Sequence, residues 1–331
     1  MTEKASIAVL GAGAFGTALA AVAASEGDTV TLVGRDATRM ETIQRQRKNE
    51  KALSGLTLPA SLTATADASE LSAADIILLA VPSQALRGAL QTYGKKIGTS
   101  TSLVICAKGI EQSSGLFLAD VVDEVLPDHP TAVLSGPGFA ADIAKGLPTA
   151  MTIASAHAGV AEKLARRISC GTFRLYASDD VIGVETGGAL KNVLAIACGI
   201  VEGRGLGESA RAALIARGLA ELMRFAKAHG GAARTVSGLS GLGDLVLTAT
   251  SHQSRNLRFG LALGQGKALD ELMAPDAPLS EGAFTASIAA KISAEKNIDM
   301  PITQAVAAIL GGHLGIDDAV DALMTRPLRS E

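Results

Sequence analysis

The sequence is poor in aromatic residues, in cysteine and in excess charge of either sign. Its 331 residues include no tryptophan, two tyrosines and seven phenylalanines, so aliphatic side chains must fill most of the core. The three cysteines are widely spaced and form neither a disulfide framework nor a metal-ligand pattern, which is typical of reduced thiols in a cytoplasmic protein. The net charge of −3 argues against nucleic acid as the main partner.

Long apolar runs are also missing. No charge-free apolar run reaches the roughly 18 residues that a membrane span requires. The best candidate, residues 300–316, is interrupted by Pro301, Gln304 and the pair Gly311-Gly312. The first five residues lack the apolar core of a signal peptide. These absences predict a cytoplasmic protein with no membrane span, and 48% hydrophobic residues with 36 glycines are typical of an α/β protein.

Strand-like and helix-like segments alternate in the first half of the chain. This alternation predicts a parallel sheet covered by helices on both faces, the doubly wound Rossmann-type α/β fold. The expected strands are 6–10, 29–33, 76–81, 103–107, 132–135 and 149–154. The expected helices are an alanine-rich one from the end of the turn at Gly16 to about residue 25, then 83–93, 116–125 and 160–168.

Strand signals stop after about residue 180, and only helical patterns follow. The switch predicts two domains, 1–185 with the sheet and 186–331 entirely α-helical. The expected helices of the second domain are 181–201, 209–229, 257–264, 285–296 and 303–310.

Three glycines form the first motif that carries chemistry. Gly11, Gly13 and Gly16 match G-x-G-x-x-G between the first strand and the first helix. In a dinucleotide-binding turn the first glycine permits a tight turn, the second lets the pyrophosphate approach the backbone, and the third lets helix and strand pack closely. The phosphates then meet the positive end of the helix dipole. The context therefore predicts NAD or NADP binding.

The tip of the second strand bears on the choice between these two cofactors. NAD-specific proteins usually have an acidic residue there, which binds the ribose 2′-hydroxyl. Here the strand is followed by Gly34 and Arg35, and Arg35 suits a 2′-phosphate, which favours NADP or dual use. Asp36 follows immediately, so NAD stays open, and Arg35 as a solvated turn residue is the alternative interpretation.

Two further strand ends carry residues of interest. Lys108 follows the strand at 103–107, and Gly136 and Gly138 follow the strand at 132–135. Ligands of open parallel sheets bind beyond the carboxyl ends of the strands. We expect Lys108 to meet a substrate phosphate or a cofactor group and the glycines to offer backbone N–H groups, although Lys108 alone also fits a loop lysine in water.

Lys191 is the only charged residue between Glu185 and Glu202. It either extends to solvent or stays inside the protein. Removing an ammonium group from water is costly and lowers its pKa, which makes a buried lysine a candidate proton carrier near neutral pH. Because a hydride-carrying cofactor needs a protein group for the matching proton, we favour the buried alternative.

Two clusters in the helical half complete the candidate site. Asp244 lies in a glycine-bounded apolar segment, and Ser254-Arg255-Asn256 follows. The planar guanidinium of Arg255 suits a phosphate, and Ser254 and Asn256 add neutral hydrogen bonds. Each cluster alone is more typical of a helix cap or a surface turn. Together with Lys191 they offer a base, an acidic partner and an anion clamp.

These motifs, in this order and spacing, resemble the bacterial NAD(P)-dependent glycerol-3-phosphate dehydrogenase family along nearly the whole chain. The matching stretches are residues 11–20, 107–110, 135–137, 187–193, 238–245, 250–251, 254–256 and 281–282.

The resemblance implies interconversion of dihydroxyacetone phosphate and sn-glycerol 3-phosphate, supplying phospholipid synthesis. It implies a Rossmann domain followed by an all-helical domain like that of 6-phosphogluconate dehydrogenase, with Lys191 as the proton donor and acceptor. Substrate-binding positions are then Lys108, Gly136, Gly138, Lys191, Asp244, Ser254, Arg255 and Asn256. Besides the three glycines of the turn, cofactor-binding positions are Ala14, Phe15, Arg35, Lys108, Ala140, Arg255, Leu279 and Glu281.

Three residues depart from the family pattern. Gly138 stands where serine or threonine is frequent, Gly34 where tryptophan is frequent, and Ser209 where asparagine is common. Two other functions stay open, a related hydroxy-acid dehydrogenase and a nucleotide-sensing protein without turnover. We assign no metal, and the five histidines suggest surface residues rather than proton carriers. A homodimer is compatible with the sequence.

Overall fold

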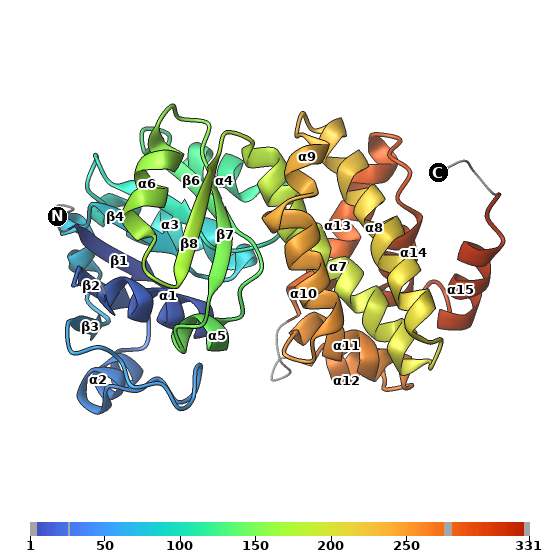
Figure 1. Ribbon diagram of the computed structural model, residues 1–331, viewed down its shortest axis with the longest axis horizontal. Coiled ribbons are helices and arrows are strands. Elements are labelled where there is room, and N and C mark those ends of the chain that lie inside the picture. Colours follow the sequence, from blue (N-terminus) through green and yellow to red (C-terminus); the bar gives the residue numbers. More distant parts are fainter. Residues whose placement is uncertain (1–4, 26, 275–279, 328–331) are drawn as a thin grey trace. The chain divides into compact units, whose positions relative to one another are not determined.

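The computed structural model describes residues 5–25, 27–274 and 280–327 (Figure 1). The chain divides into two compact units. The first unit contains residues up to Glu111 and Leu116–Glu185, and the second contains Gln112–Gly115 and the residues from Thr186 onward. The sequence had suggested no role for the short segment 112–115. In the second unit Gln112 Nε2 donates to Ser287 Oγ at 3.4 Å.

The first unit is built on one eight-stranded sheet with the order β3-β2-β1-β4-β5-β6-β7-β8. All neighbouring pairs are parallel except β6 and β7, which are antiparallel. The strands are β1 (Ser6–Leu10), β2 (Thr29–Val33), β3 (Leu62–Thr65), β4 (Ile76–Leu79), β5 (Ser102–Ile105), β6 (Thr131–Ser135), β7 (Thr149–Ala154) and β8 (Phe173–Ser178).

The sheet is thus parallel as expected except at β6 and β7. Parallel neighbours need a crossover that returns along the whole sheet. Between these two strands the only helix is α5 (Ala140–Ala144), whose five residues are too short for that return. Strands β3 and β8 were also missed. β3 has only four residues, whereas β8 alternates buried Phe173 and Leu175 with exposed Arg174 and Tyr176, a pattern that indicates a strand.

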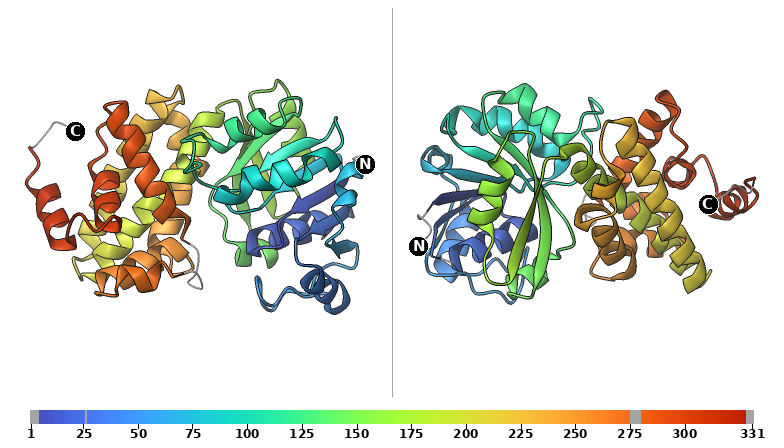
Figure 2. Two further views of the ribbon diagram at one scale, coloured as in Figure 1. Left: turned by 180° about the vertical axis from the view of Figure 1, so that it is seen from behind. Right: turned by 45° about the horizontal axis from the view of Figure 1, so that its top comes forward.

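Helices cover both faces of the sheet, as the sequence predicted (Figure 2). Ile7 and Val9 of β1 join one buried cluster, whereas Ala8 and Leu10 join the other, because successive side chains of a strand point to opposite faces. The helices of this unit are α1 (Ala14–Ser25), α2 (Ala37–Gln46), α3 (Leu86–Tyr93), α4 (Leu118–Val125), α5 and α6 (Val160–Ile168), with 3₁₀ turns η1 (Ala68–Ala73), η2 (Ser83–Ala85) and η3 (Gly94–Lys96).

The second unit is helical throughout its described residues. Its elements are α7 (Val181–Gly203, here from Thr186), α8 (Glu208–Ala228), α9 (Ala233–Val236), the π-helical turn η4 (Leu239–Gly243), α10 (Asp244–Thr250), α11 (Arg255–Gly264), α12 (Leu269–Leu272), α13 (Glu281–Glu295), α14 (Pro301–Leu310) and α15 (Ile316–Met324). Helix α7 is long and apolar enough to cross a membrane, but it is mostly buried inside the protein, as core helices are.

Helices α7 and α11 touch backbone to backbone. A Cβ atom on Gly199 would lie 2.1 Å from the carbonyl oxygen of Leu257, and one on Gly260 would lie 2.0 Å from that of Ile196. Gly203 and Gly264, four residues further along each helix, are crowded in the same way. Paired small residues at this spacing allow two helices to approach closely. The contact fixes the position of α7 against α11.

We expect Gly199→Ala to destabilise the protein by about 3 kcal/mol or more, at or above the upper end for an added core methyl group, because the obstruction is backbone. The matched control is Gly88→Ala in α3, where a Cβ would meet nothing within 4 Å. That substitution should stabilise the protein by about 0.5–1 kcal/mol through helix propensity. Denaturant unfolding of both variants measures the difference, and equal effects would contradict the packing described here.

A buried carboxyl group joins two elements of the first unit. Glu185, near the start of α7, is 5% exposed and accepts a 3.0 Å hydrogen bond from the backbone N–H of Ala119 in the first turn of α4. Burial raises the pKa of Glu185 from 4.5 to about 8, and the backbone hydrogen bond opposes this only in part. The folded protein therefore keeps Glu185 protonated at a pH where the unfolded chain ionises it.

This difference makes the stability of the protein depend on pH. Between about pH 4.5 and pH 8 the unfolded state has lost the proton that the folded state keeps, so the free energy of unfolding falls as the pH rises through this window. Glu185→Gln should remove that fall, so the variant gains stability over the wild type as the pH increases from 5 to 8. Urea unfolding across this range tests it, with exposed Glu162→Gln as the control; parallel curves for Glu185→Gln and the wild type would refute it.

Candidate functional site

The three glycines of the turn after β1 have three different surroundings. Gly11 has φ 122°, and a Cβ on it would lie 2.6 Å from the carbonyl oxygen of Ala80. A Cβ on Gly16 would lie 2.1 Å from the carbonyl oxygen of Gly11. A Cβ on Gly13 would meet no protein atom within 4 Å. The first and third glycines are thus required by packing, whereas the second leaves open backbone that a pyrophosphate can approach.

A second layer of side chains supports this turn. The carbonyl oxygen of Ala12 accepts hydrogen bonds from Arg39 Nη2 at 2.9 Å and from Asn49 Nδ2 at 3.1 Å. Asn49 is 2% exposed and also donates to Thr17 Oγ1 of α1 at 2.7 Å. These bonds orient the peptide between the first two glycines. Ala14 begins α1 and Phe15 follows it, partly buried, at the helix end that favours an anion.

The two charged residues after β2, Arg35 and Asp36, have different surroundings. Arg35 is exposed, whereas Asp36 caps α2 through a 3.0 Å bond from the backbone N–H of Arg39 to its carboxylate. Within the part of the chain that the structure describes, the carboxylate of Asp36 thus serves to cap the helix. A Cβ on Gly34 would lie 2.4 Å from Met40 Sδ and 3.2 Å from Ala12 Cβ, so a bulky residue there requires Met40 to move.

Lys108 and the glycines after β6 lie together in the first unit. Lys108 Nζ donates to the carbonyl oxygen of Gly136 at 3.1 Å. Gly136 has φ 148°, and a Cβ on it would lie 2.8 Å from Met151 Cα. Gly138 is also enclosed, with Ile143 Cδ1 at 3.1 Å from such a Cβ. Ala140 is the first residue of α5.

Lys191 is buried and engaged with two polar side chains of the second unit. Its side chain is 8% exposed, and Nζ donates to Asp244 Oδ1 at 3.0 Å and to Thr248 Oγ1 at 2.7 Å. Thr248 Oγ1 in turn donates to Asp244 Oδ1 at 3.2 Å. Asp244 and Thr248 are separated by one turn of α10, so both side chains lie on the same face of that helix. The ammonium group therefore stays inside, with an acidic partner and a hydroxyl group.

Close packing brings α10 to the lysine. A Cβ on Gly187 of α7 would lie 2.5 Å from the carbonyl oxygen of Ser240 in the turn η4. The turn leads directly into α10, whose first residue is Asp244. One helical turn after Gly187, the side chain of Lys191 meets this carboxylate. Removing the ammonium and carboxylate groups from water is expensive. The ion pair between them and the hydrogen bond to the Thr248 hydroxyl group offset this cost.

A chain of hydrogen bonds joins Asn192, the residue after Lys191, to α11 and to the start of α13. Asn256 Oδ1 accepts from the backbone N–H of Gly282 at 3.1 Å and from Ser280 Oγ at 2.7 Å. A backbone N–H can only donate, so this contact fixes the amide orientation of Asn256. Its Nδ2 then donates to Asn192 Oδ1 at 2.9 Å. Because Asn192 Oδ1 accepts this bond, the NH₂ group of Asn192 is the part that can donate hydrogen bonds to other groups.

The remaining predicted residues differ in how they are held. Ser254 is the N-cap of α11 and accepts from the backbone N–H of Leu257 at 3.1 Å, so its described role is structural. Arg255 is the first residue of α11 and is exposed, which suits a guanidinium group that meets a ligand. Glu281 begins α13. Leu279 lies outside the described residues.

Sequence analysis missed two polar residues of this cluster, Thr248 and Asn192. Both had a signal. Asn192 is adjacent to Lys191, and Thr248 stands four residues after Asp244, the spacing at which side chains share a helix face.

Two of the three cysteines and one histidine are buried outside this cluster. Cys106 and Cys198 are buried, which raises the pKa of each thiol to about 12, so little thiolate forms near neutral pH. The expectation that all histidines lie at the surface was wrong for His129, which is 7% exposed with its Nδ1 at 3.1 Å from the carbonyl oxygen of Thr101. Within the described ranges no group of three or more His, Cys, Asp or Glu residues could hold a metal ion.

Known proteins are similar to this chain along nearly its whole length. Two family models match, the NAD-dependent glycerol-3-phosphate dehydrogenase N-terminus over residues 6–161 and the corresponding C-terminus over residues 180–321. The glycerol-3-phosphate dehydrogenase [NAD(P)+] of Rhizobium etli is 60% identical over 332 residues, which span 100% of both chains. That of Agrobacterium fabrum is 58% identical over 330 residues, 99% of this chain and 100% of the other.

The fold agrees with these sequence matches. The crystal structure of glycerol-3-phosphate dehydrogenase from Coxiella burnetii superposes with a TM-score of 0.92 at 40% identity, covering 98% of this chain and 99% of that one. The sheet followed by a helical unit is thus the fold of these enzymes, as the sequence predicted. The chain belongs to the NAD-dependent glycerol-3-phosphate dehydrogenase family.

Proposed function

We propose that this protein is a glycerol-3-phosphate dehydrogenase that interconverts dihydroxyacetone phosphate and sn-glycerol 3-phosphate with NAD or NADP. The observation that carries the proposal is the buried Lys191 with Asp244 and Thr248, in a chain of this family. A ketone reduction needs a proton at the carbonyl oxygen, and a buried ammonium group is a suitable donor.

The residues of the first unit fit the dinucleotide. The open backbone at Gly13 and the start of α1 would hold the pyrophosphate, and Arg35 would contact the adenosine end. A bound NAD(P) supplies hydride transfer. Asp36 is occupied as a helix cap, and exposed Arg35 suits a 2′-phosphate, which supports use of NADP as well as NAD. Phe15, Lys108, Ala140, Arg255, Glu281 and Leu279 complete the cofactor contacts of this proposal.

Lys191 performs the proton transfer. In the direction of reduction its Nζ donates a proton to the oxygen of the substrate ketone, and in oxidation it accepts the proton of the alcohol. Asp244 and Thr248 hold Nζ at 3.0 and 2.7 Å, so the donor is in place before the reaction. General acid–base catalysis of this kind contributes roughly 10²–10⁴-fold to the rate.

Residues at the start of α11 bind the substrate phosphate. The guanidinium group of Arg255 offers paired donors, and the N-terminus of the helix favours an anion. Asn256 is held by Gly282 and Ser280 and orients Asn192 beside Lys191. Lys108, Gly136 and Gly138 supply a cation and backbone groups from the first unit. In this proposal the enzyme acts in the cytoplasm and supplies phospholipid synthesis.

The activity is tested by following NAD(P)H absorbance. We expect the wild type to oxidise NADPH or NADH with dihydroxyacetone phosphate and to react poorly with unphosphorylated dihydroxyacetone. Arg255→Ala should raise KM for the phosphorylated substrate roughly 10- to 100-fold, the range for loss of one charge-assisted contact. Arg258→Ala, an exposed arginine on the same helix, is the matched control and should leave KM unchanged.

Two other outcomes would overturn the proposal. Indifference to Arg255→Ala, together with no preference for phosphate, would favour a related hydroxy-acid dehydrogenase. Normal NAD(P)H binding without oxidation at any protein concentration would favour a nucleotide-sensing protein. A comparison of the two cofactors also tests the interpretation of Arg35.

A further inference from the structure

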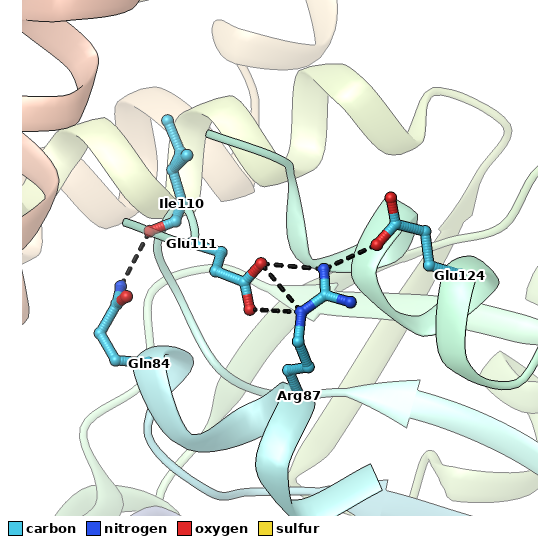
Figure 3. A network of polar contacts seen from close by, with 5 residues as sticks. All are labelled: Gln84, Arg87, Ile110, Glu111 and Glu124. Atoms are coloured by element: carbon cyan, nitrogen blue, oxygen red, sulfur yellow. Dashed lines mark hydrogen bonds and ion pairs between the residues drawn. The ribbon is translucent and has the colours of Figure 1, made fainter. Parts of the chain in front are cut away.

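Arg87 forms an ion-pair network with Glu111 and Glu124 (Figure 3). Glu111 stands three residues after Lys108 in the chain. Arg87 of α3 donates from Nε to both carboxylate oxygens of Glu111 at 3.0 and 3.1 Å, and from Nη2 to Oε2 at 2.9 Å. The same Nη2 donates to Glu124 of α4 at 2.7 Å. Charge-assisted contacts of this paired kind are strong and fix geometry as well as distance.

The two carboxylates differ in burial. The side chain of Glu111 is 6% exposed, whereas that of Glu124 is 53% exposed. An exposed ion pair contributes little because water and salt screen it. A buried carboxylate without its partner is strongly destabilising. Glu111 therefore depends on Arg87, whereas the contact with Glu124 is dispensable.

Other contacts fix the backbone at the same place. Gln84 Nε2 donates to the carbonyl oxygen of Ile110 at 2.8 Å (Figure 3). The backbone N–H of Glu111 donates to the carbonyl oxygen of Leu116 at 3.0 Å. Ile110 is 1% exposed and forms an antiparallel bridge with Phe117. The chain at residues 110–111 is thus held through its backbone and through its side chains.

Only Gly109 separates Lys108 from the fixed residues Ile110 and Glu111. Gly109 has φ 154°, a conformation that other residues rarely adopt. Because glycine allows many backbone dihedral angles, the residue itself does not restrain Lys108. The backbone segments before and after the Lys108-Gly109 pair must therefore fix the orientation of the lysine. Strand β5 holds the chain before Lys108, and the anchored residues Ile110 and Glu111 hold it after Gly109. Loss of the second anchor frees the glycine and, with it, the lysine.

We propose that Glu111, held by Arg87, is a positioning residue that keeps Lys108 directed toward the carbonyl oxygen of Gly136, ready for the ligand. The consequence for catalysis rests on the role of Lys108 in the proposed function. The position of the lysine side chain itself does not depend on that function, so the two ideas can be tested separately.

The first test measures kcat and KM for dihydroxyacetone phosphate. Glu111→Gln should lower kcat/KM about tenfold, less than the roughly 100-fold that a misplacement of 1 Å can cause. Glu124→Gln, which removes the exposed carboxylate from the same guanidinium group, is the matched control and should stay within about twofold of the wild type. An unchanged kcat/KM for Glu111→Gln would overturn the proposal.

A double-mutant cycle separates positioning from general stability. In a Lys108→Ala background the lysine is absent, so adding Glu111→Gln should change kcat/KM by less than about twofold. A full additional tenfold loss would show that Glu111 acts on the fold and not through Lys108. If Glu111→Gln does not fold, Arg87→Lys replaces it in the cycle, since lysine keeps the charge and loses the paired geometry.

The last test needs no turnover. Acetylation of the folded protein with acetic anhydride, followed by mass spectrometry, reports how accessible Lys108 is. Its labelling should be faster in Glu111→Gln than in the wild type and unchanged in Glu124→Gln. Equal labelling in all three proteins would refute the positioning role. A wild type that is inactive with dihydroxyacetone phosphate would refute the proposed function and leave this result standing.

Discussion

The polar groups of the second unit depend on how closely helix α7 packs against its neighbours. Five glycines make these approaches, since a Cβ on Gly187, Gly199, Gly203, Gly260 or Gly282 would lie within 2.6 Å of a carbonyl oxygen of the neighbouring element. Gly187 meets the turn before α10, Gly199 and Gly260 join α7 to α11, and Gly282 lies against the backbone of Asn192. Side chains near these contacts therefore have little freedom to move.

This packing explains how one buried charge can be retained. Lys191 projects from α7, a mostly buried helix, and meets the carboxylate of Asp244 in α10. Neither charge alone would be tolerated at that depth, because an unpaired buried ion is costly. The pair therefore holds the ammonium group in place, as the proposed proton transfer requires. The same logic applies to Glu111 and Arg87, where a buried ion pair fixes a loop.

Much of the fold and part of the site could be predicted from the sequence. The turn at Gly11–Gly16 and the change from alternating to purely helical patterns are local signals, and the structure contains both. The antiparallel approach of β7 to β6 could not be predicted, because strand direction depends on the path of the connection rather than on composition. The positions of Thr248 and Asn192 beside Asp244 and Lys191 were a hint, but only the placement of α10 and α11 against α7 shows that their side chains make these contacts.

The central claim is that Lys191 transfers the proton that accompanies hydride transfer. Single-turnover oxidation of bound NADPH by saturating dihydroxyacetone phosphate tests it most directly, with Lys191→Met beside the wild type. The account predicts a rate constant roughly 10²–10⁴-fold lower in the variant, with NADPH binding preserved. A rate constant equal to that of the wild type would contradict it.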